Sequence, residues 1–203
     1  MSGRQVIHVV HSGAYLQCYT CLVAGGGGAV LVDPGSDAGH AGVLEGIGRA
    51  GFRLRDVAAA LLTHCHVDHA AAAHRFAASG VPLVASPRTA AVLAADGRQV
   101  WYEHPEQITP AAVEIIVEDG QRLTLGGVRF TALHTPGHTG GCTSYLFETD
   151  GGTVAFTGDL LMPNGHPGWA GSDDFSAADT LRSLERLLAV GPDRVLTGHG
   201  PVE

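Results

Sequence analysis

The chain has 203 residues, of which 45 % are hydrophobic and 16 % charged, so an intrinsically disordered protein is excluded and residues 1–203 suit one domain with a sizeable core. Its net charge of −8 and its lack of a long basic run argue against a nucleic-acid partner. No apolar run is long enough to span a membrane, and Met1–Gln5 lacks the apolar segment of a signal peptide. We therefore expect a cytoplasmic protein that acts on a small molecule, without a membrane partner.

Short apolar runs bounded by glycine and proline predict an α/β chain with many short strands. In the first half, strands are expected near residues 6–10, 16–23, 29–32, 57–62 and 82–85, and helices near 39–50, 69–79 and 87–95. A loop near 97–112 carries Trp101 and Tyr102. The second half predicts strands near 113–117, 122–125, 128–133, 142–148, 153–157 and 194–197, and a helix near 176–190 with Leu181, Leu184, Leu187 and Leu188 on one face. Glycines at 25–28 and 126–127 suit hairpin turns.

Residues 63–69 read Thr-His-Cys-His-Val-Asp-His, at the junction between a predicted strand and a predicted helix. His64 and His66 are two residues apart, so in an extended segment both imidazoles face the same way and can bind one metal ion. Cys65 then points elsewhere and makes a poor ligand. Asp68 and His69 follow where the chain turns, and can face a second ion beside the first. The segment therefore predicts a metal site at the carboxyl end of a strand.

Three further residues of ligand type come after short predicted strands, each beside glycine or proline. His138 lies in Thr135-Pro136-Gly137-His138-Thr139, Asp159 follows Gly158, and His199 lies between Gly198 and Gly200. Small residues let the backbone turn sharply and approach an ion closely. We expect these three side chains to complete the site.

In this order, the H-x-H-x-D-H motif at 64–69, the T-P-G-H-T motif around His138, Gly158-Asp159 and the terminal Gly-His-Gly resemble the metallo-β-lactamase superfamily. The segment Val32-Asp33-Pro34-Gly35 also matches, and the resemblance covers about residues 6–201. It implies a four-layer αβ/βα sandwich, with the metal site at one edge of the two sheets.

The resemblance also implies a role for each residue. His64, His66 and His138 would hold one metal, Asp68, His69 and His199 a second, and Asp159 would bridge them. Asp33 and His134 would orient the ligand imidazoles through hydrogen bonds. Two zinc ions are the expected cofactors, although the same ligands can also take iron or manganese.

Hydrolysis is the expected reaction, since two zinc-like ions can share a hydroxide at neutral pH and stabilise the oxyanion that develops on the substrate. Asp68 would hydrogen-bond the hydroxide and carry a proton to the leaving group, which makes it the expected catalytic residue. A bridging carboxylate at Asp159 resembles the glyoxalase II-like, lactonase-like and nuclease-like branches more than true β-lactamases. A small thioester, ester or lactone is therefore the expected substrate.

Three alternatives remain open. The resemblance would give a mononuclear iron sulfur (persulfide) dioxygenase the ligands His64, His138 and Asp159. A phosphodiesterase or nuclease has the same fold, and a non-catalytic binding module is the third possibility. In the glyoxalase II-like branches a Gly-Cys-Gly-Arg element follows the Gly-Asp pair, but here the chain reads Asn-Gly-His-Pro-Gly-Trp at 164–169. His166 and Trp169 of this loop are candidates for lining the substrate pocket.

The chain has four cysteines, and we expect them to pack rather than react. Cys18 and Cys21 form a lone C-x-x-C in a predicted strand, without a second pair to complete a zinc site. Cys142 begins another predicted strand.

Overall fold

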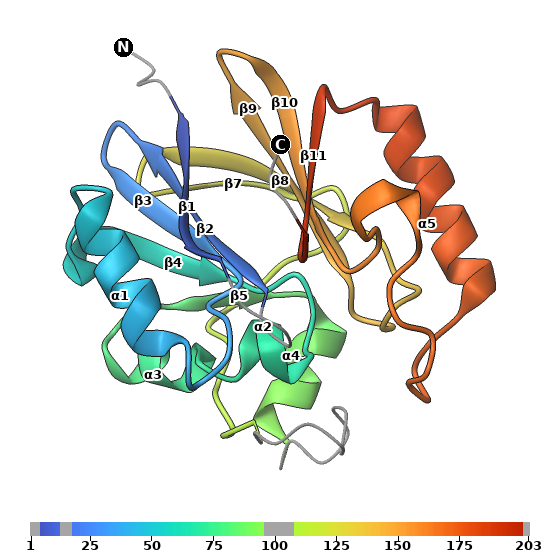
Figure 1. The fold of residues 1–203 in the computed structure, drawn as a ribbon, viewed down its shortest axis with the longest axis horizontal. Helices are drawn as coiled ribbons and strands as arrows, with labels where there is room; N and C mark the ends of the chain where they lie inside the picture. The colour runs from blue at the N-terminus through green and yellow to red at the C-terminus, as the bar shows by residue number, and fades with distance from the viewer. Residues whose placement is uncertain (1–4, 13–17, 96–107, 201–203) are drawn as a thin grey trace.

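Two β-sheets pack face to face, each with helices on its outer side (Figure 1), in a computed structural model that describes residues 5–12, 18–95 and 108–200. The first sheet has the order β1-β2-β3-β4-β5-β6 and the second β11-β10-β9-β8-β7. The strands of the first sheet are β1 (Val6–Ser12), β2 (Tyr19–Gly25), β3 (Gly28–Val32), β4 (Val57–Leu61), β5 (Leu83–Ala85) and β6 (Ile115–Ile116). Those of the second are β7 (Arg122–Leu125), β8 (Val128–His134), β9 (Thr143–Thr149), β10 (Gly152–Gly158) and β11 (Arg194–Thr197).

The helices lie on the two outer surfaces of this pair of sheets (Figure 1). On the side of the first sheet are α1 (His40–Arg49), α2 (Val67–Ala70), α3 (Ala73–Ala78) and α4 (Pro87–Ala94), and on the side of the second is α5 (Ala177–Val190). Two short 3-10 helices are η1 (Leu54–Asp56) and η2 (Pro163–Gly165).

Three hydrophobic clusters separate these layers. Ile47 and Phe76 belong to the cluster between the first sheet and its helices, and Tyr145 and Phe147 to the one between the sheets. Leu187 of α5 belongs to the third cluster, on the outer side of the second sheet. Three separate cores require four layers, so the predicted αβ/βα sandwich is confirmed.

Two glycine hairpin turns, one from each sheet, touch each other. They lie at the opposite end of the sandwich from the ligand-type residues. Gly126 and Gly127 have φ of +57° and +76°, which a tight hairpin turn between β7 and β8 requires. A β-carbon on Gly127 would lie 2.8 Å from the backbone nitrogen of Gly27, so the β2–β3 and β7–β8 turns touch backbone to backbone. Both predicted hairpins are confirmed.

The predicted helix at 69–79 is wrong in one respect, because the chain forms α2 and α3 with a break between them. Gly35 donates its N–H to the carbonyl of His69 at 2.9 Å and accepts the N–H of Ala72 at 3.0 Å. The loop after β3 thus takes backbone groups that a continuous helix would pair internally, and it fixes the position of His69.

The predicted apolar face of α5 is also partly wrong. Leu187 is buried, but Leu181 and Leu188 are 60 % and 78 % exposed. The buried face includes Thr180 and Ser183 instead, because α5 packs on the loop after β8, where Ser183 donates to the carbonyl of Pro136 at 2.7 Å.

Trp101 and Tyr102, with residues 97–107 of the predicted loop, lie outside the described residues. Among the described residues, no helix is both long and apolar enough to cross a lipid bilayer.

Candidate metal centre

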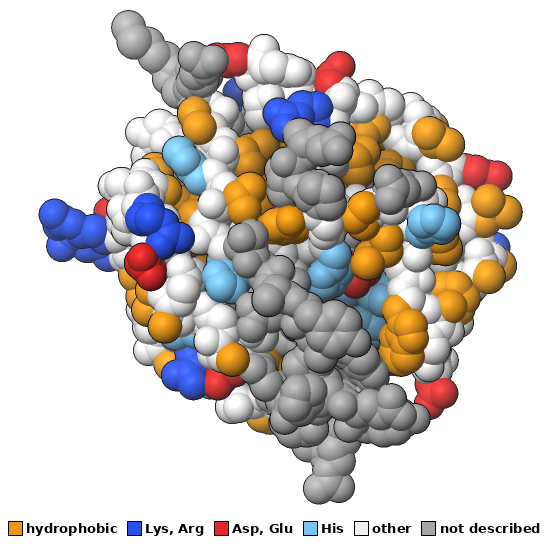
Figure 2. All heavy atoms as spheres, viewed as in Figure 1, with side chains coloured by type: hydrophobic (Ala, Val, Ile, Leu, Met, Phe, Trp, Pro, Cys, Tyr) orange, Lys and Arg blue, Asp and Glu red, His pale blue; other side chains and the backbone are white. Residues whose placement is uncertain are grey.

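The ligand-type residues lie together at one edge of the sandwich, where five strands end. Asp33 follows β3, the 64–69 segment follows β4, His138 follows β8, Asp159 follows β10, and His199 follows β11. On the face drawn in Figure 2, histidine and acidic side chains reach the surface close together, near the middle of the view, with hydrophobic side chains beside them. The structure therefore brings together all seven residues for which the sequence predicts metal ligation: His64, His66, Asp68, His69, His138, Asp159 and His199.

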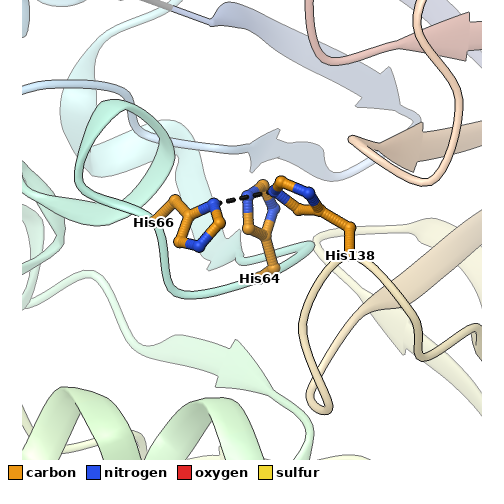
Figure 3. A group of neighbouring side chains, drawn as sticks. All are labelled: His64, His66 and His138. Carbon is orange, nitrogen blue, oxygen red and sulfur yellow. Dashed lines mark hydrogen bonds between the residues drawn. The ribbon is translucent and has the colours of Figure 1, made fainter. Parts of the chain in front are cut away.

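His64, His66 and His138 form the first group, and their rings point toward one another (Figure 3). The Nδ1 of His66 lies 2.7 Å from the Nε2 of His138. All three side chains are buried, and one nitrogen from each lies within 4.8 Å of the others. Three converging imidazole nitrogens match the first predicted metal set.

Asp68, His69 and His199 form the second group. The Nε2 of His199 lies 3.0 Å from Oδ2 of Asp68 and 3.2 Å from Nε2 of His69. Asp68 and His69 sit in the first turn of α2, so the helix that begins at Val67 presents both to this point.

Asp159 lies between the two groups. Its Oδ1 is 3.3 Å from the Nε2 of His69, while its Oδ2 is 3.6 Å from the Nε2 of His138. Oδ2 is also 3.4 Å from the Nε2 of His199. One carboxylate therefore faces nitrogens of both groups.

Two buried atoms in this cluster indicate that the residues present fit metal ions. The Nε2 of His64 and the Oδ1 of Asp159 have no hydrogen-bond partner, although both are buried. A buried acceptor without a partner is costly, and a buried carboxylate needs a positive neighbour. Divalent cations would satisfy both atoms, and imidazole with carboxylate is a ligand chemistry that zinc accepts.

Hydrogen bonds set which ring nitrogen of each imidazole faces the centre. Asp33 Oδ2 accepts from Nδ1 of His69 at 2.8 Å, and the carbonyl of Trp169 accepts from Nδ1 of His138 at 3.1 Å. In both rings the Nε2 lone pair is then free to face the centre. Asp33 thus bonds the ring of His69, a contact that fits the orienting role implied by the resemblance.

Thr63 also contacts the site residues, although the sequence patterns predict no role for it. Its backbone N–H and its hydroxyl donate to the two carboxylate oxygens of Asp33, at 2.8 and 2.7 Å. The same hydroxyl oxygen lies 3.1 Å from Nδ1 of His64, where it accepts the ring proton. A hydroxyl residue directly before the first histidine of the motif was the available signal.

The prediction that His134 orients a ligand imidazole is not supported by its contacts. Its Nε2 donates to the carbonyl of Val117 at 3.0 Å, and its backbone N–H donates to Asp119 at 2.9 Å. The chain turns at Pro136 and Gly137, between His134 and His138. The two histidine rings therefore contact different parts of the fold.

Burial and neighbouring charges shift the imidazole pKa values in opposite directions for the first group and for His199 of the second. Burial lowers the pKa of His66 to about 3 and also lowers the pKa of His64 and of His138, so these rings are neutral, as metal ligands must be. Burial alone would lower the pKa of His199 too, but hydrogen bonds to Asp159 and Asp68 outweigh it and raise that pKa to about 9. A cation in the second group would take the place of this proton.

Comparison with known proteins agrees with this geometry. A family model of the metallo-β-lactamase superfamily matches residues 13–199. The chain belongs to the metallo-β-lactamase superfamily. This superfamily consists of hydrolases whose fold implies divalent metal binding, and the histidine and aspartate groups described above are where this member could hold such ions.

Individual proteins are similar to this chain over nearly its whole length. An uncharacterized protein of Mycobacterium tuberculosis is 33 % identical over 208 residues, which cover 90 % of this chain and 85 % of that protein. A hydroxyacylglutathione hydrolase of Acidiphilium cryptum is 34 % identical over 182 residues, covering 89 % of this chain and 63 % of that protein. Among solved structures, a metallo-β-lactamase of Cronobacter sakazakii matches with a TM-score of 0.75 and 30 % identity, covering 90 % of this chain and 72 % of that one.

In this member of the superfamily, α5 and α4 hold the loop that carries His138. A β-carbon on Gly137 would lie 2.3 Å from Oγ1 of Thr180 in α5, and the φ of Gly137 is +148°, so only glycine fits. On the other side, Ser86 at the start of α4 donates to the carbonyl of Gly141 at 2.6 Å. The T-P-G-H-T motif is thus shaped by helix contact as well as by the ligand it carries.

All four cysteines are buried and free, as the packing interpretation requires. Burial raises the pKa of Cys18 to about 11 and that of Cys65 and Cys142 to about 12, so these thiols stay protonated and are poor nucleophiles. Cys18 nevertheless lies with His69 and Asp33 in one cluster, a proximity that the sequence reasoning did not foresee.

The two pocket candidates lie in the loop between β10 and α5. His166 is exposed, and its backbone carbonyl accepts from Met162 at 2.7 Å. The indole of Trp169 lies with its ring centroid 6.5 Å from that of His66. Trp169 therefore borders the first group of ligands, while the role of His166 stays a prediction.

Asp33→Asn should weaken metal binding at the second group by roughly 10- to 100-fold. Asp33 accepts three hydrogen bonds, two from Thr63 and one from His69, whereas an asparagine side chain has one acceptor oxygen. One donor must lose its partner or the His69 ring must change its tautomer, which would put a proton on its Nε2.

Competition with a chelator of known affinity measures this effect. Asp193→Asn is the matched control, because Asp193 also accepts a backbone N–H, that of Thr153 at 2.8 Å, but belongs to no ligand group. Wild-type metal affinity in Asp33→Asn would contradict the orienting role.

Proposed function

We propose that this member of the superfamily is a dinuclear hydrolase of small thioesters, esters or lactones, with two zinc ions as its expected cofactors. The observation that carries the proposal is the position of Asp159 between the two ligand groups. Its two oxygens lie 3.3 Å from His69, 3.6 Å from His138 and 3.4 Å from His199. A carboxylate between two cations reduces their mutual repulsion, so the arrangement favours two ions over one.

Divalent ions in such a site lower the pKa of water to about 7 and polarise a substrate carbonyl. The neutral imidazoles of the first group and the mixed set of the second would hold them. Asp68 is buried, and its Oδ2 accepts a hydrogen bond from His199. Its carboxylate can therefore take a proton at the centre and deliver it to the leaving group, which is the catalytic role proposed for it. Among the described cysteines, the raised pKa values leave no activated thiolate to compete with this route.

Substrate class is inferred from relatives and from Asp159 together. The relative from Acidiphilium cryptum is named a hydroxyacylglutathione hydrolase, and this name suggests acyl-thiol compounds as substrates to test. The solved structure from Cronobacter sakazakii is named a metallo-β-lactamase, so β-lactams belong in the same substrate panel. A carboxylate between the two ligand groups, as at Asp159, resembles the glyoxalase II-like and lactonase-like branches, and it therefore favours thioesters, esters and lactones over β-lactams.

The iron dioxygenase is the second candidate. It needs one ion and uses His64, His138 and Asp159. The convergence of Asp68, His69 and His199 into a complete further set favours two ions.

Removing the metal should abolish hydrolysis, and adding back zinc or manganese should restore it. None of the seven ligand-type side chains belongs to a hydrophobic cluster, so the metal-free chain should keep its fold. The measurement is metal content after purification without added metal, followed by activity on thioesters, lactones, aryl esters and a β-lactam before and after chelation.

About two zinc ions per chain with restored thioester, ester or lactone hydrolysis would support the proposal. One iron per chain would favour the dioxygenase. Full activity in a verified metal-free sample would contradict a metal-dependent reaction. Circular dichroism of the chelated sample controls for unfolding.

A further inference from the structure

The loop between β10 and α5 is fastened to the metal centre at several points. The carbonyl of Trp169 accepts from Nδ1 of His138 at 3.1 Å, and Oγ of Ser172 donates to the carbonyl of His138 at 3.4 Å. Gly168 lies so close that a β-carbon on it would be 2.1 Å from the carbonyl oxygen of Asp159. The loop therefore packs directly against His138 and Asp159.

Trp169 presents an apolar ring from this loop. Gly171 packs closely against the indole of Trp169, since a β-carbon on Gly171 would lie 2.2 Å from Cζ2 of the ring. Even so, Trp169 is 47 % exposed, and its ring lies 6.5 Å from that of the ligand His66 at an interplanar angle of 62°. A partly exposed indole beside a candidate catalytic centre offers an apolar face on which a ring of a ligand can stack.

The charged residues of the loop indicate whether a ligand at Trp169 is anionic or neutral. Residues 160–175 contain no lysine or arginine, and their two acids are Asp173 and Asp174. Asp174 already accepts from the N–H of Gly140 at 2.8 Å and pairs with Arg88 at 3.3 Å. The loop itself offers no arginine or lysine to an anionic carrier, and Arg88, which contacts the loop, is already paired with Asp174.

We propose that Trp169 recognises the acyl group of the substrate, and that the preferred substrates are neutral thioesters or esters whose acyl group carries an aromatic ring. The inference rests on the proposed hydrolase function and adds a substrate class to it. A substrate carbonyl at the metal centre would place its acyl substituent within reach of the indole, where ring-on-ring contact adds to the burial of apolar surface.

The test compares N-acetylcysteamine thioesters of phenylacetic and acetic acid, which are neutral and differ only in the ring. For each variant, kcat/KM is measured on both, and the affinity of the zinc-loaded protein is measured for the two matching ketones in which a methylene separates the carbonyl from sulfur. These ketones cannot be hydrolysed, so binding is read without turnover. The variants are Trp169→Ala, Trp169→Phe and Gly171→Ala.

Trp169→Ala should reduce the preference for the phenylacetyl compound over the acetyl one by about tenfold, in both kcat/KM and affinity. Trp169→Phe should recover much of it, because the ring is kept. Gly171→Ala should reduce it, because the new methyl group displaces the indole. Leu188→Ala, at an exposed position of α5, is the control and should match the wild type.

Metal content should be unchanged in Trp169→Ala, since the contact with His138 is made by the backbone. An unchanged preference in Trp169→Ala, or no binding of the phenyl ketone by the wild type, would overturn the inference. Hydrolysis of both thioesters with the same preference in wild type and variant would leave the proposed function standing. Binding that depends on Trp169 without any cleavage would overturn the hydrolysis and leave the recognition.

Discussion

Asp159→Ala should give a folded chain that binds at most one metal ion tightly and has lost activity by more than about 100-fold, the upper end of the cost of losing an orienting partner. The carboxylate oxygens of Asp159 face His69, His138 and His199 together. Removing it takes a ligand from both groups at once and leaves two cations without the charge between them. The loss should therefore exceed that of a ligand belonging to one group.

The fold should tolerate this change because Asp159 belongs to none of the three hydrophobic clusters. Asp159→Asn should perform little better than alanine, since a neutral amide keeps the shape but cannot balance two positive charges. The contrast between the two variants separates the effect of volume from that of charge.

Metal titration of both variants beside the wild type, with activity measured on the same samples, provides the test. Asp193→Ala removes a carboxylate that bonds the backbone of Thr153 outside the ligand groups, and it should keep full metal content. If Asp159→Ala bound two ions with near-normal affinity and turned over normally, the bridging role would be wrong.

Gly168→Ala should damage the metal centre although it removes no ligand. The added β-carbon would lie 2.1 Å from the carbonyl oxygen of Asp159 and 2.8 Å from Nδ1 of His138. Neither neighbour can give way freely, because one is backbone and the other is a ligand ring whose Nδ1 is bonded to the carbonyl of Trp169. Either the His138 ring turns or the loop moves away.

We expect at least a tenfold loss of metal affinity, about 1.4 kcal/mol, together with about 1–3 kcal/mol of lost stability from overpacking. Gly48→Ala is the matched control, since a β-carbon there meets nothing within 4 Å and alanine is the better helix former in α1. Thermal unfolding and metal titration of the two variants decide the matter. Equal behaviour of Gly168→Ala and Gly48→Ala would show that the loop does not press on the ligands.

Local sequence patterns predict where most strands and helices lie and which residue types follow them. The strands predicted near 128–133 and 153–157 became β8 and β10, and their positions placed His138 and Asp159 at one edge. This works because hydrophobic periodicity and glycine turns are local properties of the chain, and because the ligands are carried by the first residues after each strand.

The direction in which individual side chains face depends on how the layers pack in three dimensions. His134 and His138 are four residues apart in the sequence, yet one bonds the carbonyl of Val117 and the other that of Trp169. Leu181 and Leu188 share a predicted apolar face with Leu187, but they are exposed because α5 packs on the His138 loop. The contacts of Thr63 with Asp33 and of Gly168 with Asp159 join segments 30 and 9 residues apart. Contacts of this kind depend on how the layers dock, and no pattern along a single segment encodes them.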